Sequence, residues 1–405
     1  MADSPTSKRS QKIIYIAFWI LTAAYGGLCL YLYYMQSIQP ADYVNSYFVA
    51  DLPYHISMVR DDGWYYSLTG LVYLLLLKVG AGSTVPIAIF LALVSAATVV
   101  ITERFLKKLW NLESGIACAG ALALNFVMPF YIRWAGEHRY ISYQSGTVWH
   151  NSTYQVMKLG ALICLYLYFE YEKRYYKKGS EGLKVWEYII FAFSLAFTTF
   201  IKPSFLTVFA PALAIKLLRD IAKSKATFLK AVYFGVTVLP AVAVMFWQNK
   251  VLFGDDTGNG FRFAIMDQFK LHADHPKITI LLSLAFPIAV AAALVIEAVW
   301  TKIKTGKMPM IDVHYFFSAI MAFIGLMIAA TLAETGEREG AGNFLWGYAI
   351  ALSFLYMTTF VQWAGFIKKK RYADFAVCGA IFAYQLVCGI IFFVRLLGGE
   401  TYFMK

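Results

Sequence analysis

Long apolar runs alternate with short polar segments along the whole chain. An α-helix needs roughly 20 apolar residues to cross the hydrocarbon core of a bilayer. Runs of that length predict eleven membrane-spanning helices near 13–35, 85–105, 114–132, 154–172, 185–201, 203–220, 228–250, 279–300, 314–333, 343–366 and 373–396. The pattern therefore predicts an all-α polytopic membrane protein.

One further apolar segment, 65–78, has only about 14 residues, a length typical of re-entrant or interfacial helices. If it does not cross, the main basic clusters all fall on one side of the bilayer. These clusters are Lys8/Arg9/Lys12, Arg104/Lys107/Lys108, Lys173/Arg174/Lys177/Lys178/Lys184, Lys216/Arg219/Lys223/Lys225/Lys230, Lys302/Lys304/Lys307 and Lys368/Lys369/Lys370/Arg371. Because basic loops stay in the cytoplasm, we expect a cytoplasmic N-terminus, an outer C-terminus and a re-entrant helix in the first outer loop, 36–84.

Composition supports a membrane protein and limits its partners. The chain is 60% hydrophobic and only 15% charged, whereas soluble domains are about 25% charged. The net charge of +12 suggests nucleic acid, but no zinc-finger, helix-turn-helix or RNA-binding signature accompanies it. We expect a multi-pass protein of the plasma membrane, with the lipid bilayer as a partner and no nucleic acid. The run at 13–34 is expected to be an uncleaved anchor because it is too long for a signal-peptide core.

Polar residues of varied chemistry gather in the four predicted outer loops, 36–84, 133–153, 251–278 and 334–343. All histidines except His314 lie there, whereas the inner loops are mostly plain Lys and Arg clusters. The five cysteines fall in predicted helices and are interpreted as apolar packing residues. We therefore expect any chemistry on the outer face.

The first outer loop carries Asp51-Leu52-Pro53-Tyr54-His55 shortly after the first helix. Charges beside a membrane helix are functional candidates. Asp51 is alternatively a helix N-cap, since Pro follows at an early helical position. His55 lies one helical turn after Asp51 and is placed to orient it. Asp61 and Asp62 are rival carboxylates, with a solvated turn as their other role.

A first outer loop with an Asp, then a re-entrant helix and a span ending in basic residues, resembles the GT-C class of integral membrane glycosyltransferases. The stretches Trp149-His150-Asn151-Ser152-Thr153-Tyr154 and Gly336-Glu337-Arg338…Gly342-Asn343-Phe344-Leu345-Trp346-Gly347 are similar to those of bacterial members. The resemblance implies a polyprenyl-phosphate sugar donor and a catalytic carboxylate at Asp51. We expect one membrane domain, 1–405, because nothing in the sequence marks a separate soluble domain. The resemblance divides it into a GT-C-like catalytic core at 1–250 and additional C-terminal helices at 251–405. The chain lacks the paired Asp-Glu and the large soluble domain of larger members, so the expected acceptor is a cell-surface glycan or a lipid-linked carrier.

Transfer from such a donor requires a general base for the acceptor hydroxyl and positive charge or hydrogen-bond donors for the departing phosphate. We expect Asp51 and His55 to be catalytic. The expected substrate-binding residues are Lys202, Arg338, His150, Arg139, Glu337, Asn151 and Trp149. Other roles stay open, since Lys202 can snorkel, Arg338 can pair with Glu334 or Glu337, and Trp149 can belong to an interfacial belt.

No cofactor is expected, although the spacing of Asp51-x-x-x-His55 and His272-x-x-His275 leaves a divalent metal open. Two rival functions remain. One is a polysaccharide polymerase or ligase, which usually carries a large late outer loop. The other is a lipid or polysaccharide transporter, which places charges on broken helices near the membrane midplane.

Overall fold

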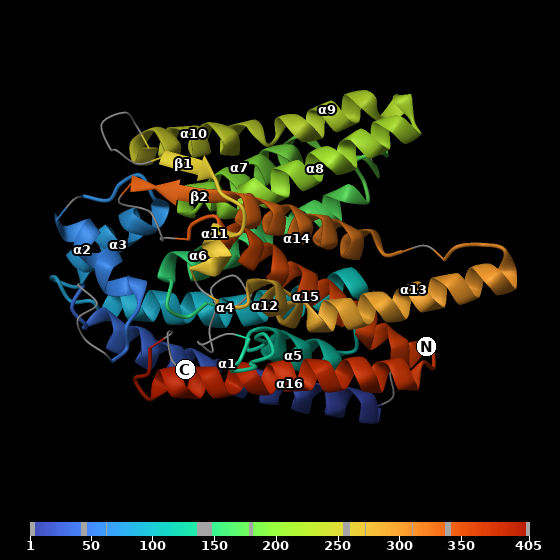
Figure 1. The fold of residues 1–405 in the computed structure, drawn as a ribbon, viewed down its shortest axis with the longest axis horizontal. Helices are drawn as coiled ribbons and strands as arrows, with labels where there is room; N and C mark the ends of the chain where they lie inside the picture. Colours follow the sequence, from blue (N-terminus) through green and yellow to red (C-terminus); the bar gives the residue numbers. More distant parts are fainter. Residues whose placement is uncertain are drawn as a thin grey trace.

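The computed structural model describes residues 5–41, 47–61, 63–135, 148–177, 181–253, 260–271, 273–309, 311–336 and 342–401. The helices run roughly along the long axis of the molecule, with the N-terminus at one end and the C-terminus at the other (Figure 1). We call the end that carries α2 (Asp51–Asp61) and α3 (Leu68–Val79) the α2–α3 end. The opposite end is the N-terminal end.

Within these ranges, seven helical segments are long and apolar enough to span a membrane. They lie in α1 (Pro5–Ser37), α4 (Val85–Trp110), α9 with α10 (Phe228–Val236 and Leu239–Phe253), α13 (Ala285–Thr305), α14 (Val313–Thr331), α15 (Leu345–Lys368) and α16 (Tyr372–Leu397). The chain is thus an all-α polytopic membrane protein, as predicted. The other four predicted spans are shorter or more polar helices, α5 (Ser114–Leu124), α6 (Ser152–Glu172), α7 (Val185–Ile201) and α8 (Ser204–Lys223).

The outward faces of the helices are apolar. Ile20 of α1, Phe193 of α7 and Ile296 of α13 each expose more than half of their surface. Exposed large apolar side chains on many helices are typical of a protein that faces lipid.

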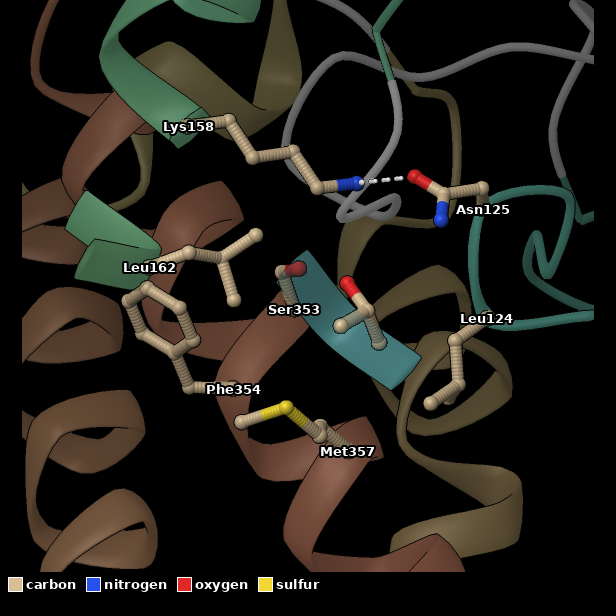
Figure 2. A pocket seen from close by; sticks show the side chains of 8 residues that line it. Leu124, Asn125, Lys158, Leu162, Ser353, Phe354 and Met357 are labelled. Atoms are coloured by element: carbon tan, nitrogen blue, oxygen red, sulfur yellow. Dashed lines mark hydrogen bonds between the residues drawn. The ribbon is translucent and has the colours of Figure 1, made fainter. Parts of the chain in front are cut away.

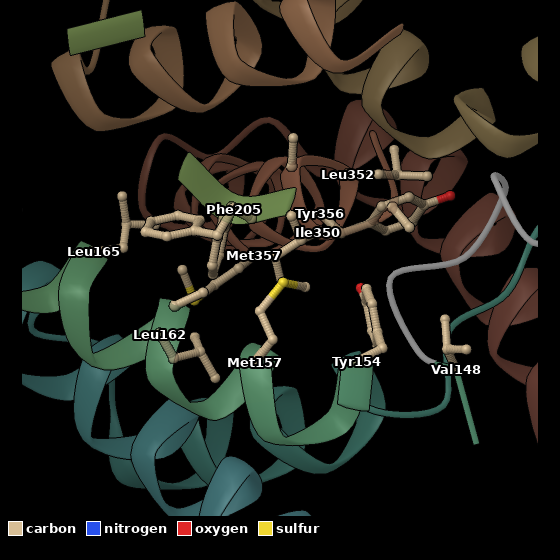
Figure 3. Close-up of a cluster of buried hydrophobic side chains, with 14 of the residues drawn as sticks. Val148, Tyr154, Met157, Leu162, Leu165, Phe205, Ile350, Leu352, Tyr356 and Met357 are labelled. Atoms are coloured by element: carbon tan, nitrogen blue, oxygen red, sulfur yellow. The ribbon is translucent and has the colours of Figure 1, made fainter. Parts of the chain in front are cut away.

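The core forms where α15 runs between α6 and α8. Figure 3 shows Tyr154, Met157 and Leu162 of α6 facing Phe205 of α8 and Ile350 of α15. Almost every residue of α15 up to Val361 is buried.

Helix α5 is shorter than predicted. The apolar run 114–132 predicts one span, but the helix ends at Leu124 and residues 127–132 are non-helical. Pro129 explains this end, because a proline ring lacks an N–H and clashes with the carbonyl four residues earlier, here that of Asn125. The unwound backbone is paired inside the protein, where Met128 N–H donates to the Gln385 carbonyl at 3.2 Å.

Two other predicted spans are also divided. The run 228–250 forms α9 and α10, and 279–300 forms α12 (Pro276–Ser283) and α13. Helix α9 ends four residues before Pro240 and α12 ends four residues before Pro287. Both breaks therefore have the same physical cause as the end of α5.

A two-stranded ribbon, which the hydropathy pattern does not predict, joins the third and fourth polar loops. Strand β1 (Gly260–Phe263) pairs antiparallel with β2 (Leu332–Thr335), and Phe261 lies opposite Glu334. The short helix α11 (Asp267–Lys270) follows β1. The ribbon lies at the α2–α3 end (Figure 1), so residues of the first, third and fourth polar loops gather there.

Candidate functional site

The first and second polar loops meet at Asp51. The Asp51 N–H donates to the His150 carbonyl at 2.9 Å, and Asn151 Nδ2 donates to Asp51 Oδ2 at 2.6 Å. The two side chains are 100 residues apart in sequence. Asp51 is the first residue of α2 and is half-buried, so its carboxylate is held among polar groups of the folded protein.

Asn151 orients this carboxylate. It is the N-cap of α6, and its Oδ1 accepts hydrogen bonds from Tyr154 N–H and Thr153 Oγ1, both at 2.8 Å. An N-cap residue satisfies backbone donors that the helix leaves without partners. Because the amide oxygen is fixed in this way, the amide nitrogen Nδ2 is fixed too and points at Asp51.

Lys202 is held at the same helix terminus. It ends α7 in an extended conformation before Pro203, as expected for the residue that precedes a proline. Its Nζ donates to Thr153 Oγ1 at 3.2 Å and lies 5.1 Å from the centre of the Trp346 ring. A chain of hydrogen bonds therefore runs from Asp51 through Asn151 and Thr153 to Lys202.

Trp346 is a site residue that the sequence pattern did not single out. Its ring centre lies 5.9 Å from that of His150 and 5.7 Å from that of Tyr154. Both Trp346 and His150 are buried. The only signal in the sequence was that Trp346 lies in the second stretch quoted for the GT-C resemblance.

The segment before Trp346 is held by Glu334, which is buried in β2. Asn343 Nδ2 donates to both carboxylate oxygens of Glu334 at 3.0 Å, and Asn343 N–H donates to Oε2 at 3.2 Å. The ribbon thereby positions the start of α15. The predicted residues Arg139, Glu337 and Arg338 lie outside the described residues.

His55 lies one turn along α2 from Asp51. Its Nδ1 and Ser152 Oγ are 3.1 Å apart, and its ring centre lies 5.0 Å from that of Trp64. Burial lowers the pKa of His55 from 6.5 to about 4; the nearby Asp51 opposes this shift, whereas Lys202 and His150 add to it. The ring is therefore uncharged at neutral pH and contributes hydrogen bonding rather than positive charge.

Trp149 lies in the interior. Its side chain is almost fully buried, its Nε1 donates to Tyr25 OH at 3.1 Å, and its ring packs 4.8 Å from that of Phe393. Tyr25 belongs to α1 and Phe393 to α16. These contacts anchor the segment that carries His150 and Asn151, and they cover the indole that a sugar would need for stacking.

Among the described residues, no group of three or more His, Cys, Asp and Glu side chains is placed to hold a metal ion. His272, one of the two histidines of the helical spacing noted above, lies outside these residues. Its partner His275 is exposed, and its ring centre is 5.7 Å from that of Trp134.

A second polar feature, a small cavity, lies deeper in the bundle. Its lining includes Thr102, Asn125, Lys158 and Ser353. Figure 2 shows the Lys158 side chain directed at Asn125, with Nζ 3.4 Å from Asn125 Oδ1. Lys158 is only 3% exposed, which makes it a buried amine beside the point where α5 unwinds.

Comparison of the chain with models of protein families, with curated proteins and with solved structures finds no match.

Proposed function

We propose that this protein is a membrane glycosyltransferase with Asp51 as its general base. In this proposal it moves a sugar from a polyprenyl-phosphate donor to a cell-surface glycan or lipid-linked acceptor, with inversion at the anomeric carbon. The observation that carries the proposal is that one helix terminus holds both a carboxylate and an ammonium. Asn151 and Thr153 at the start of α6 bond to Asp51 and Lys202, respectively.

The residue chemistry matches a single displacement. The acceptor oxygen forms a bond to the anomeric carbon while the bond from that carbon to the phosphate oxygen breaks. The acceptor proton passes to Asp51, and the polyprenyl phosphate leaves with the bonding electrons. Positioned general bases typically contribute about 10²- to 10⁴-fold to such rates.

The leaving phosphate needs compensation of its charge. Lys202 supplies a cation, and the N-terminus of the 21-residue helix α6 supplies the positive end of a helix dipole. His150 contributes a further polar group beside Trp346. Arg139 and Arg338 remain candidates for the same role, and Glu337 remains a candidate for binding the substrate, in keeping with the GT-C resemblance.

The proposed orientation places the α2–α3 end outside the cell. It includes eleven crossings, the seven long apolar segments together with α5, α6, α7 and α8. Polar residues gather at the α2–α3 end, whereas the C-terminal ends of α4, α6, α8, α13 and α15 and the loops that follow them lie towards the N-terminal end (Figure 1) and carry basic clusters. This separation supports cytoplasmic placement of the N-terminal end.

A transporter of lipid-linked saccharides is the second candidate, and one observation favours it. Helix α5 stops at Leu124 inside the bundle, and the buried Lys158 bonds to Asn125 at that point. Discontinuous helices and buried charges commonly form the substrate sites of transporters. The chemistry at Asp51 favours the transferase, because transport needs no general base.

The test is an assay of the purified protein in nanodiscs, mixed with cell membranes that supply the acceptor. The donors are polyprenyl-phosphate glucose, mannose and galactose, each radiolabelled in the sugar. We expect label to enter a membrane glycan or lipid with inverted configuration from at least one donor. Failure to transfer label from any of them, together with movement of the same lipids across proteoliposomes, would replace the transferase by the transporter.

A further inference from the structure

Three buried polar atoms without hydrogen-bond partners are concentrated between Trp64 and Tyr73. They are Trp64 Nε1, Thr69 Oγ1 and Tyr73 OH, and none has a partner in the described part of the chain. Thr69 and Tyr73 are almost completely buried, and Trp64 is 9% exposed. Because buried polar atoms are nearly always paired in folded proteins, three such atoms within ten residues indicate a missing partner.

These atoms border the candidate site. The Trp64 ring packs against His55, which bonds to Ser152. The Tyr73 hydroxyl lies near Ser152 as well, but no hydrogen bond joins the two side chains. Thr69 and Tyr73 are four residues apart in α3 and so share one face of that helix.

Hydrogen bonds tie the start of α3 to the end of α7, next to Lys202. Ser67 Oγ donates to the Ile201 carbonyl at 3.1 Å, directly before Lys202. The Gln248 amide nitrogen donates to the Tyr66 carbonyl at 2.9 Å and to the Phe200 carbonyl at 3.1 Å. The atoms without partners thus lie between the segment that holds Lys202 and the helix that begins with Asp51.

An oxygen-rich and uncharged group would match these atoms. The Trp64 indole N–H only donates, so its partner is an acceptor. Trp64, Thr69, Tyr73 and Ser152 are neutral, and His55 is uncharged at neutral pH. A phosphate is expected to bind at the cationic side of the site, near Lys202, whereas hydroxyl groups can pair with these neutral donors and acceptors.

We propose that Trp64, Thr69 and Tyr73 form the subsite for the hydroxyl groups of the transferred sugar. This subsite rests on the proposed glycosyltransferase function and adds the place of the sugar to that of the phosphate. The three atoms are covered in the present structure, so the side chains that cover them must shift for a sugar to reach them. A bound sugar then supplies the hydrogen bonds that these three atoms lack.

Two conservative variants test the subsite, and only Tyr73→Phe keeps the shape of the side chain. Tyr73→Phe removes only the hydroxyl, and Trp64→Phe removes the N–H with part of the ring. Matched controls are Tyr348→Phe and Trp110→Phe, because Tyr348 OH and Trp110 Nε1 are also buried without partners but belong to α15 and to the far end of α4. Removing a buried polar group that has no partner leaves stability unchanged or raises it.

The measurements are the dissociation constants of polyprenyl-phosphate glucose, mannose and galactose, and of polyprenyl phosphate without a sugar, in nanodiscs. For the donor that the wild type binds best, we expect Tyr73→Phe and Trp64→Phe each to weaken binding about tenfold, the usual effect of one hydrogen bond. Binding of the sugar-free lipid should not change. The melting temperature of Tyr73→Phe should be equal to or above that of the wild type.

Each outcome has a distinct meaning. Unchanged donor binding in both variants overturns the subsite and leaves the transferase intact if the wild type still transfers sugar. Equal weakening of donor and sugar-free lipid also overturns it, because the effect then does not concern the sugar. If the wild type neither binds nor transfers any of the three donors, the proposed function fails and the subsite fails with it.

Discussion

Asn151 connects the local structure of a helix terminus to the geometry of the site. Its oxygen caps α6 and its nitrogen bonds to Asp51, so the same side chain starts the helix and orients the carboxylate. Spacing places His55 one helical turn from Asp51, whereas Asn151 and Lys202 are expected near them only through the outer-face topology and a family resemblance. Their contacts depend on side chains that are 100 residues apart for Asp51 and Asn151 and 49 apart for Thr153 and Lys202, which no local pattern encodes.

The protonation of His55 should make stability depend on pH. Its pKa is about 4 in the folded protein and 6.5 as its ordinary value, so the unfolded chain binds the additional proton first as the pH falls. The stabilising effect of the neutral ring is therefore present above pH 6.5 and is lost progressively as the pH falls towards 4. Melting temperatures in detergent at pH 7 and pH 5 should differ less in His55→Gln than in the wild type.

His275→Gln is the matched control for this prediction, because His275 is exposed. It should keep the pH dependence of the wild type. An identical loss of melting temperature on acidification in the wild type and in His55→Gln would show that His55 is not the responsible group.

At the scale of elements, proline positions explain where apolar runs stop being helical. Helices α5, α9 and α12 all end four or five residues before Pro129, Pro240 and Pro287, whereas α8 continues through Pro211. Hydropathy alone predicts the runs but cannot tell a continuous helix from a divided one. The ribbon of β1 and β2 was missed for a related reason, since four-residue strands in polar loops have no strong periodic signal.

The unwound end of α5 depends on Gly389 of α16. A Cβ atom on Gly389 would lie 1.5 Å from the Phe126 carbonyl oxygen, so any larger residue must push the backbone of the unwound segment away. We expect Gly389→Ala to lower the free energy of unfolding by about 3 kcal/mol, at the upper end of overpacking effects. Chemical denaturation in detergent measures this change.

Gly365→Ala serves as the control, since nothing lies within 4 Å of a Cβ atom at this position in α15. It should be neutral or stabilise by about 0.5–1 kcal/mol, as expected for Ala in place of Gly within a helix. Similar effects of the two substitutions would contradict the close approach of Phe126 to α16.

At the scale of the whole molecule, the lengths of the apolar runs and the distribution of charges predict an integral membrane protein. They also predict that its polar loops lie at one end. They do not fix the number of crossings, because α5 and α7 are shorter than 18 residues and α6 and α8 carry charges. Lys216 shows why the number of charges in a helix does not decide whether that helix crosses the membrane. Within α8 it is buried, 2.9 Å from Glu172 and 2.7 Å from Asp220, so it is a paired structural residue rather than a free basic group.

Cysteine labelling tests the proposed orientation. Ser83 lies in the exposed turn between α3 and α4, and Lys304 is exposed near the end of α13. A membrane-impermeant maleimide should label Ser83→Cys in intact cells and Lys304→Cys only after the cells are permeabilised, with the unmodified chain as background. The reverse pattern would place the α2–α3 end in the cytoplasm and remove the site from lipid-linked donors on the outer face.

The central claim is that Asp51 is the general base of sugar transfer, and its most direct measurement is the transfer rate of Asp51→Asn. The comparison is with Asp61→Asn, a carboxylate that is exposed at the other end of the same helix. With polyprenyl-phosphate sugars as donors, we expect Asp51→Asn to lower the rate at least about 100-fold, with an unchanged melting temperature, and Asp61→Asn to keep most of the activity. Full activity in a folded Asp51→Asn variant would contradict the claim.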